Sequence, residues 1–237
     1  MLSVENLSFS YGDRCILRDV SMKVEDGDIY AVLGRNAVGK TTLLNVLTGV
    51  LRPGGGRFSI DGVDLEGGYP ESMRMKIGAM RPIVGTFRKM RCEQYLEFVC
   101  GLYGVNRSEI YEASKTYEFE SELQRTIKNC SAGTVKKIEF CAATIHKPKI
   151  LFLDEPFEAV DPIVAVEMKE RIKDYAGLGN SVIVTSHILD VVQNLCNKYA
   201  IINDGTVARE GIIDFGADSE KGMGALEKIF VDVVGNE

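Results

Sequence analysis

The chain has 237 residues, of which 45% are hydrophobic and 26% charged, and its formal net charge is −6. These values are typical of a globular protein with one large core, and the acidic balance disfavours non-specific nucleic-acid binding, which depends on neutralising phosphates. No uninterrupted apolar stretch approaches the roughly 20 residues of a membrane-spanning helix. Because residues 1–9 also lack the pattern of a secretion signal, we expect a cytoplasmic location.

The cysteines are scattered along the chain without any C-x-x-C pair, and most have apolar neighbours in the sequence. This pattern favours buried, reduced thiols over a metal site. The six positions are Cys15, Cys92, Cys100, Cys130, Cys141 and Cys196.

Three strand-like runs occupy the first 33 residues, at 2–9, 15–24 and 29–33. Turn-forming residues at 12–13 and 26–28 separate them. We expect an antiparallel sheet that flanks a parallel core.

Residues 34–41 read GRNAVGKT and match the pattern G-x-x-x-x-G-K-[ST] of a phosphate-binding loop, here called the phosphate loop. The segment follows the apolar run 29–33 and precedes a helix-forming stretch at 42–47. In this setting the backbone N–H groups and the positive end of the helix face phosphate oxygens, so nucleotide binding is favoured over a chance match. Lys40 would supply charge to the β- and γ-phosphates, and Thr41 a hydroxyl to Mg²⁺. The candidate nucleotide-binding residues here are Gly34, Arg35, Asn36, Ala37, Val38, Gly39, Lys40, Thr41 and Thr42.

A break in the pattern at 52–56 separates this region from a short strand at 57–60. Farther on, the apolar spacing at 93–103 is helical, and 108–123 is predicted to form another helix. We interpret this part of the chain as a helical insertion.

The second half alternates strands, at 150–153 and 181–185, with helices at 163–175 and 188–196. Such alternation predicts a parallel sheet with crossover helices. Residues 161–162 read Asp-Pro, a typical helix start because the carboxylate caps free N–H groups and proline lacks one.

The buried strand at 150–153 ends in two carboxylates, Asp154 and Glu155. Asp154 could hold Mg²⁺, while Glu155 could accept a proton from the water that attacks a γ-phosphate. The alternative is a strand followed by an ordinary acidic turn, and it is less favoured because the same chain contains a phosphate loop.

His187 follows the strand at 181–185 and could donate a hydrogen bond to a γ-phosphate oxygen from the same sheet edge. A lone histidine is more often structural. The other histidine, His146, precedes Lys147 and Pro148, so we expect an exposed turn there without a functional role.

The order of these motifs resembles that of an ABC-type ATPase over nearly the whole chain. The resemblance also includes the segment Cys-Ser-Ala-Gly-Thr at 130–134, called the signature segment below, and the residues at 159–162 and 185–187. It implies an α/β fold: a P-loop NTPase core with a parallel sheet, a flanking antiparallel β-subdomain and an inserted α-helical subdomain. It divides the single domain into a core with the β-subdomain at 1–81 and 147–237, and a helical subdomain at 82–146.

The resemblance assigns further site residues and implies ATP and Mg²⁺ as cofactors. Tyr11 would stack on adenine, although it could be one more strand aromatic. Ser131, Ala132 and Gly133 would contact the γ-phosphate held by the opposite subunit of a head-to-tail dimer, ahead of a helix at 134–145. By sequence alone they would pass for a helix cap. Asp161 would lie in a loop at the dimer interface.

Two segments, at 90–99 and 226–231, are similar to ATP-binding subunits of bacterial exporters of the ABC-2 or bacitracin-exporter type. Such subunits are separate polypeptides, so the resemblance implies a transmembrane permease partner and a position on the inner face of the membrane. A second ATPase subunit would form a homodimer or a heterodimer with the chain. For 226–231 the alternative is a plain amphipathic helix packed on the domain.

Three departures from the family pattern bear on activity. Pro82 replaces a glutamine that helps to hold Mg²⁺ and links ATP to the membrane partner, unless Arg81 or a water substitutes, and a lost ligand of this kind costs about 1.5–3 kcal/mol. Ala132 replaces a glycine and Thr134 a glutamine; the methyl group of Ala132 either strains a positive-φ backbone or only crowds the phosphate. Ala37 and the following Val38 make the phosphate loop bulkier than usual.

The altered residues affect mainly what the chain would offer to a neighbour's site. The lost ligand at Pro82 leads us to expect slower hydrolysis, and the altered signature segment leads us to hypothesise a partner ATPase with an intact signature. Two alternatives to an exporter ATPase stay open: a nucleotide-sensing subunit that scarcely hydrolyses ATP, and an ABC ATPase with a soluble partner.

Overall fold

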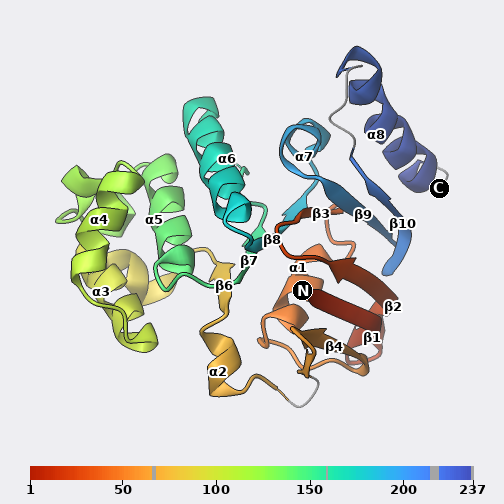
Figure 1. Ribbon diagram of the computed structural model, residues 1–237, viewed down its shortest axis with the longest axis horizontal. Coiled ribbons are helices and arrows are strands. Elements are labelled where there is room, and N and C mark those ends of the chain that lie inside the picture. Colours follow the sequence, from red (N-terminus) through yellow and green to blue (C-terminus); the bar gives the residue numbers. More distant parts are fainter. Residues whose placement is uncertain (66–67, 159, 214–218, 236–237) are drawn as a thin grey trace.

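The computed structural model describes residues 1–65, 68–158, 160–213 and 219–235, with side chains from Leu226 onward in the last range (Figure 1). The strands are β1 (Leu2–Tyr11), β2 (Arg14–Val24), β3 (Ile29–Leu33), β4 (Gly55–Ile60), β5 (Val63–Asp64), β6 (Ile77–Met80), β7 (Ile150–Asp154), β8 (Ser181–Ser186), β9 (Lys198–Asn203) and β10 (Thr206–Ile212). The helices are α1 (Lys40–Leu47), α2 (Glu71–Arg74), α3 (Cys92–Tyr103), α4 (Ser108–Thr116), α5 (Ala132–Thr144), α6 (Pro162–Gly177), α7 (Leu189–Leu195) and α8 (Ser219–Val234), with short 3₁₀ turns at Gly85–Lys89, Glu120–Glu122 and Ile127–Asn129.

The larger sheet has the strand order β10-β9-β3-β8-β7-β6, and only β10 runs antiparallel to its neighbour. Every residue of β3 and β8 is buried, as expected for parallel strands covered on both faces. The register pairs Leu33 with Ser186 and Asp154 with Thr185. The carboxyl ends of β3, β7 and β8 therefore meet at one edge, which is where the phosphate loop begins.

The smaller sheet is antiparallel, with the order β2-β1-β4-β5. Its residues on β1 alternate between the core and solvent, with Leu2, Val4, Leu7 and Phe9 buried. Together with α1, this sheet packs against one face of the parallel sheet. The predicted antiparallel sheet is confirmed, except that the run at 29–33 is β3 of the parallel sheet.

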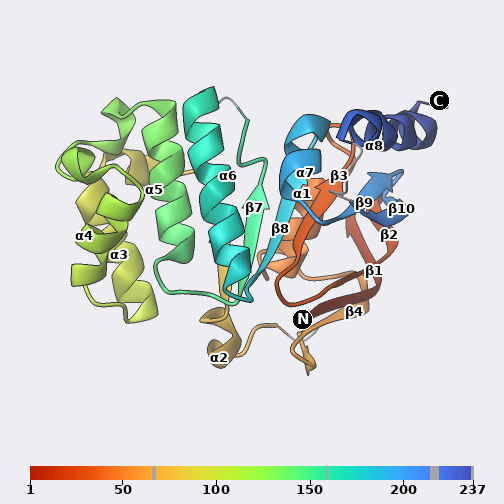
Figure 2. The ribbon, with the colours of Figure 1, turned by 45° about the horizontal axis from the view of Figure 1, so that its top comes forward.

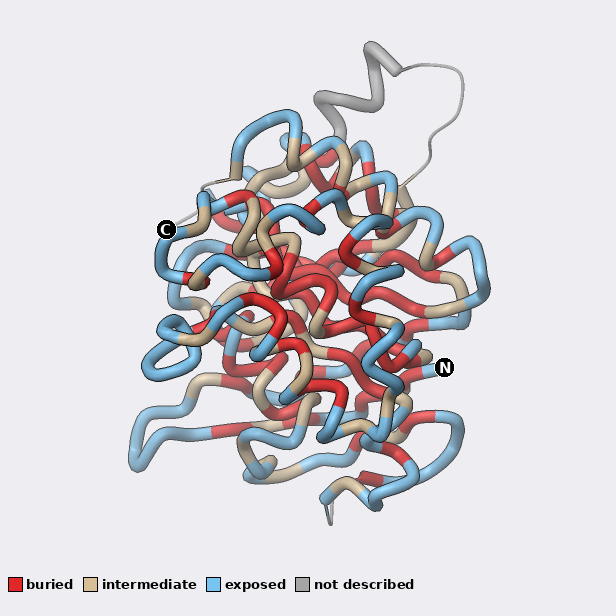
Figure 3. Tube along the Cα trace, turned by 90° about the vertical axis from the view of Figure 1, so that its left-hand side faces the viewer, coloured by how far each residue is buried: buried red, intermediate tan, exposed pale blue. Residues whose placement is uncertain are grey.

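The other face of the parallel sheet is covered by α6, α7 and α8 (Figure 2). The side chains of β7 point alternately to the two faces of the sheet. Phe152 packs toward α1 and the antiparallel sheet, whereas Leu151 and Leu153 pack toward α6. Figure 3 shows the buried residues concentrated along the middle of the molecule. Within the described residues, no helix combines the length and apolar character needed to span a bilayer.

Helices α3, α4 and α5 stand beside the sheet, on the side away from the antiparallel strands (Figure 1). They enclose a core of their own, whose buried members all fall between Ile83 and Ile145. The exact division at 82–146 stays a prediction. The predicted helix at 108–123 is too long, because α4 ends at Thr116 and Glu118 has a left-handed backbone with φ +57°.

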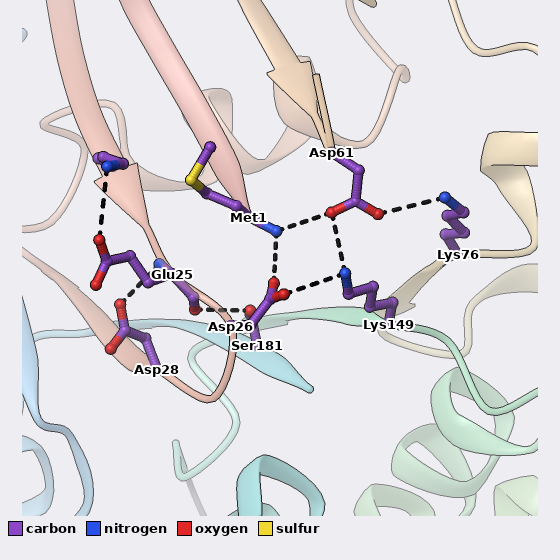
Figure 4. Close-up of polar contacts among 9 residues, drawn as sticks. Met1, Glu25, Asp26, Asp28, Asp61, Lys76, Lys149 and Ser181 are labelled. Carbon is purple, nitrogen blue, oxygen red and sulfur yellow. Dashed lines mark hydrogen bonds and ion pairs between the residues drawn. The ribbon is translucent and has the colours of Figure 1, made fainter. Parts of the chain in front are cut away.

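A network of charged groups joins the two sheets at the amino edge of the parallel strands (Figure 4). Lys149 Nζ lies 3.2 Å from Asp26 and 3.0 Å from Asp61, while Lys76 Nζ lies 3.3 Å from Asp61 and the Met1 amino group contacts both aspartates. Burial acts to raise the pKa of Asp61, but hydrogen bonds from these cations outweigh it and hold that pKa below its usual range. The network fixes the antiparallel sheet against the start of β7.

The cysteines follow the sequence interpretation only in part. In the described chain all six are free, and Cys92, Cys100, Cys141 and Cys196 are buried. Cys15 is exposed on β2, so the expectation of burial is wrong there.

The expectation of an exposed turn at His146 is also wrong. The residue is only 8% exposed, its ring stacks on Tyr103 with centroids 3.8 Å apart, and its Nε2 lies 2.9 Å from the Ile77 carbonyl oxygen. His146 follows the end of α5 at Thr144 by two residues, and its ring packs on Tyr103, the last residue of α3. Burial, opposed by the Ile77 carbonyl, lowers the pKa of His146.

We expect this histidine to make the protein acid-sensitive. Its pKa is lowered by folding, so its contribution to stability is complete above the unfolded-state pKa and is lost as the pH falls toward the folded-state pKa. Denaturant unfolding at pH 7.5 and 5.5 should show a smaller loss in His146→Phe, which keeps the stacking, than in the wild type. An equal loss in both proteins would contradict the assignment.

Candidate active site

The phosphate loop runs from the end of β3 to the start of α1, and two of its glycines are sterically required. A Cβ at Gly34 would lie 2.7 Å from the Ile202 carbonyl oxygen. Gly39 has φ +116° as the residue before α1, and a Cβ there would lie 3.0 Å from Leu17. The sequence thus forms a close-packed loop that opens directly into a helix N-terminus.

Lys40, the first residue of α1, points back into this loop. Its side chain is only 6% exposed, and Nζ donates hydrogen bonds to the carbonyl oxygens of Gly34 (2.8 Å) and Arg35 (3.2 Å). The same nitrogen lies 3.3 Å from Glu155 Oε1. The structure thus brings together the predicted cation and the predicted base.

Two hydroxyl groups converge on Asp154 Oδ1 at the end of β7. Thr41 Oγ1 donates at 3.2 Å and Thr185 Oγ1 at 2.7 Å, and the Thr185 hydroxyl in turn accepts from the backbone N–H of Glu155 at 2.9 Å. No role for Thr185 could be predicted, because nothing in the pattern of a buried strand distinguishes this polar residue near its end. The pairing of β7 with β8 places it there.

Glu155 connects the lysine to the histidine. Its Oε2 lies 3.1 Å from Nδ1 of His187, while its other oxygen faces Lys40. The backbone of Glu155 is left-handed, with φ +44°, and this turns the side chain away from the strand direction. Such strain at a strand end is typical of functional positions.

Lys40, Thr41, Glu155 and His187 line one cleft of about 510 Å³, whereas Asp154 and Thr185 are not among its lining residues. It contains Tyr11, which is 51% exposed and stands edge-on to Phe9 at 4.8 Å. Arg14 and Glu158 also line it, although no motif pointed to them. The lining residues are Tyr11, Arg14, Ile16, Asn36, Ala37, Gly39, Lys40, Thr41, Thr42, Glu155, Glu158 and His187.

The signature segment lies outside this cleft, at the start of α5. Ser131 is the N-cap, and its hydroxyl accepts from the backbone N–H of Thr134 at 3.1 Å. Ala132 is the first helical residue, so its backbone is right-handed and the strain considered for it does not arise. Gly133 is buried, and a Cβ there would lie 3.0 Å from Val164 of α6.

Asp161 also lies apart from the cleft, at the start of α6. Its carboxylate accepts from the backbone N–H of Ile163 at 2.9 Å, and Pro162 takes the first helical position. The predicted helix start is confirmed. Ala159, in the same family segment, lies outside the described residues.

Mg²⁺ fits the donors that Thr41 and Asp154 present. Their oxygens are already within hydrogen-bond distance of each other, and Mg²⁺ prefers oxygen ligands and takes few from the protein when phosphates supply the rest. In the described part of the chain there is no group of three histidine, cysteine or carboxylate side chains that could hold a metal alone. The residues therefore suit a cation that arrives with a nucleotide.

The fold and this cleft define an α/β protein of the P-loop nucleotide-binding class. A family model described as ABC transporter matches residues 17–158. This chain is 30% identical to AlbC of Bacillus subtilis strain 168, which is provisionally described as an ABC transporter ATP-binding protein. The match covers 100% of this chain and 99% of AlbC. The chain therefore belongs to the ABC transporter family, and the expectation of an ABC-type ATPase is confirmed.

Two further similarities bear on the assignment. The lantibiotic transport ATP-binding protein SrtF of Streptococcus pyogenes is 29% identical, with 97% of this chain and 96% of SrtF covered. A solved ATP-binding subunit of an ABC transporter superposes with a TM-score of 0.85 at 26% identity, covering 98% of this chain and 99% of that one. The expected architecture of an ATP-binding cassette is thus confirmed.

Ala37 provides a test of the loop geometry. It is exposed and has φ +64°, a conformation that costs a residue with a Cβ about 1–2 kcal/mol. Ala37→Gly should therefore raise the free energy of unfolding by up to about 1 kcal/mol, after the extra entropy of glycine in the unfolded chain is counted. Urea unfolding measures the change.

Ala132→Gly is the matched control, because the same substitution there meets a right-handed helical backbone. It should give no gain and a loss of up to about 1 kcal/mol. Equal effects of the two substitutions would contradict the role of the backbone at residue 37.

Proposed function

We propose that this chain hydrolyses ATP to power a membrane exporter. The observation that carries the proposal is the convergence of Lys40, Glu155 and His187 in one cleft, beside the oxygen pair of Thr41 and Asp154. The lantibiotic transport role in the name of SrtF supports export as the direction.

In this proposal the residues of the site share the tasks of binding the nucleotide and activating the attacking water. Lys40 exchanges its contact with Glu155 for a γ-phosphate oxygen, while Tyr11 stacks on the base. Thr41 and Asp154 hold Mg²⁺, which supplies Lewis-acid stabilisation of the developing charge. Glu155, released from Lys40, accepts a proton from the attacking water, and His187 orients Glu155 and donates to the γ-phosphate.

The remaining predicted residues suit a second subunit. Ser131 is exposed at the N-terminus of α5, outside the chain's own cleft, where a helix end attracts an anion. We propose that it contacts the γ-phosphate of an opposite subunit in a head-to-tail dimer, with Asp161 at the interface. The methyl group of Ala132 then crowds that phosphate, which favours a mixed pair in which the partner has an intact signature.

We propose that the permease docks in the groove between α1, α2 and the end of α3. This groove measures about 950 Å³ and is lined by Arg81 near the cleft and by Leu102 and Tyr103 on α3. Leu102 is 66% exposed, as expected for an apolar side chain that a partner covers. The chain would thereby reside peripherally on the inner face of the cell membrane.

Glu155→Gln tests the assigned base. Turnover should fall about 100-fold, because a positioned general base contributes at least that much. Affinity for Mg-ATP should stay equal or rise, since the substitution removes a negative charge that faces the phosphates and frees Lys40. Phosphate release and calorimetry give the two quantities.

Two further variants complete this test. Lys40→Ala should weaken Mg-ATP binding about tenfold or more, through the loss of charged hydrogen bonds. Glu170→Gln, the same change at an exposed site on α6, should alter neither quantity. Unchanged turnover in Glu155→Gln would refute the assignment, and a wild type that binds Mg-ATP without releasing phosphate would favour the sensing alternative.

Leu102→Glu tests the docking groove. Co-purification from membranes with the permease should fall about fivefold or more, as for a buried interface residue. Leu178→Glu places the same charge on the far end of α6, where the side chain is 81% exposed, and should leave co-purification unchanged. If the two variants are recovered equally, the groove is not the docking site. Recovery of the wild type only in the soluble fraction would favour a soluble partner.

A further inference from the structure

We propose that Cys92 and Cys130 are a site of oxidative modification, at which a peroxide joins the two thiols in a disulfide that displaces Ser131, the N-cap of α5. No motif pairs these cysteines, which lie 38 residues apart in the sequence. The disulfide itself rests on the contacts of the two side chains. Its effect on turnover rests on the proposed function.

The two sulfur atoms are neighbours within the helical subdomain. Cys92 is the first residue of α3, Cys130 immediately precedes the cap of α5, and their Sγ atoms lie 3.6 Å apart. The Cys92 N–H donates to the Arg125 carbonyl oxygen at 3.0 Å. The Ile127 N–H donates to the Met90 carbonyl oxygen, also at 3.0 Å. These backbone bonds hold the two cysteine-bearing segments side by side.

The two thiols differ in their access to solvent. Cys92 is fully buried, and its Sγ donates to the Arg125 carbonyl oxygen at 3.2 Å. Burial, together with the contact to Cys130, raises the pKa of Cys92 to about 12, so its thiol stays protonated. Cys130 is only partly buried and lies between the 3₁₀ turn Ile127–Asn129 and α5. A peroxide in solution therefore reaches Cys130 first.

Two charged side chains lie beside the accessible thiol. Glu122 Oε2 is 3.9 Å from Cys130 Sγ, where it can accept the thiol proton, and 3.0 Å from Nη1 of Arg125. The guanidinium offsets the negative charge of the carboxylate next to a sulfur that reacts as a thiolate. The surroundings of Cys130 thus provide a proton acceptor and a compensating cation.

The reaction proceeds in two steps that balance. The Cys130 thiolate attacks one oxygen of hydrogen peroxide and the O–O bond breaks, which gives a sulfenic acid and, after protonation of the released hydroxide, water. Cys92 Sγ then attacks the sulfenic sulfur. The S–S bond forms, the S–O bond breaks, and the departing hydroxide takes the Cys92 proton to give a second water. The two thiols lose two electrons in total, and the peroxide gains them.

The new bond acts on the residue next to Ser131. A disulfide is about 2.05 Å long, so the gap of 3.6 Å between the sulfur atoms closes by about 1.5 Å. Because Cys92 is fixed in a buried helix end, most of this movement falls on Cys130. The Ser131 hydroxyl caps α5 by accepting from the Thr134 N–H at 3.1 Å, and displacement weakens that cap. In the proposed dimer it also misplaces the serine at the partner's γ-phosphate.

The experiment treats the full chain with hydrogen peroxide and then with dithiothreitol. Peptide mass spectrometry without prior reduction identifies the link, hydrogen exchange at 131–136 follows the start of α5, and phosphate release and calorimetry give turnover and Mg-ATP affinity. Cys92→Ser and Cys130→Ser each remove one sulfur and keep a hydroxyl donor. Cys15→Ser is the matched control, because it removes the exposed thiol of β2, which donates to the Leu17 carbonyl oxygen.

In the wild type, peroxide should join the peptides of Cys92 and Cys130 and leave the chain two hydrogen atoms lighter. Exchange at 131–136 should rise about fivefold, as for a lost N-cap, and turnover should fall about tenfold or more, since a misplacement of about 1 Å can cost that much. Mg-ATP affinity should change less than about threefold, because neither cysteine lines the nucleotide cleft. Dithiothreitol should restore exchange and turnover.

The serine variants separate this response from damage elsewhere. Cys92→Ser and Cys130→Ser should form no link and lose the response to peroxide, whereas Cys15→Ser should keep both. Should Cys92→Ser fail to fold, Cys130→Ser decides the case from the accessible side.

The proposal is overturned if peroxide leaves the two thiols unlinked or joins Cys130 of two chains instead. It is also overturned if the linked protein exchanges or turns over like the reduced one, or if both serine variants keep the response. A reduced wild type that releases no phosphate contradicts the proposed function, and the mass and exchange measurements then still decide whether the disulfide forms and displaces the start of α5.

Discussion

The parallel register of β3, β7 and β8 is the constraint on which the site depends. It aligns Leu33 with Ser186 and Asp154 with Thr185, so three segments far apart in the sequence end at one edge. The alignment of the strands is therefore enough to bring the polar side chains at and just beyond their ends close together. The buried apolar faces of the strands secure this alignment, because a slip of one residue would turn each side chain to the opposite face.

In and beside the cleft, Lys40 faces Glu155, and Asp154 accepts hydrogen bonds from two hydroxyl groups. Lys40 contacts one carboxylate and two carbonyl oxygens among the described residues, and in the proposed function a phosphate would replace them. Asp154 instead accepts two hydroxyl groups on a single oxygen and leaves the other for a cation. The proposed nucleotide and Mg²⁺ would therefore meet a lysine and two carboxylates that are already held in place by the protein.

The sequence predicted those parts whose local pattern carries the chemistry. The phosphate loop, the Asp154–Glu155 pair and His187 could be found because short-range spacing defines them. The place of Thr185 beside Asp154 could not, because it arises from the pairing of β7 with β8. His146 and the end of α4 were misjudged for a related reason: tertiary burial and a single left-handed residue outweigh local polarity and periodicity.

The close approach of Gly133 to Val164 has a genetic consequence. Because α5 starts directly against α6, the signature segment and the loop at Asp161 are held together, and in the proposed head-to-tail dimer they would face the partner as one surface. In that dimer, a bulky side chain at 133 would impair the composite site that holds the partner's nucleotide and would spare the phosphate loop of the subunit that bears it. A hybrid pair with this lesion in one subunit and a damaged phosphate loop in the other would keep one intact composite site, because both defects fall in the same one, whereas both defects in one subunit would damage both sites.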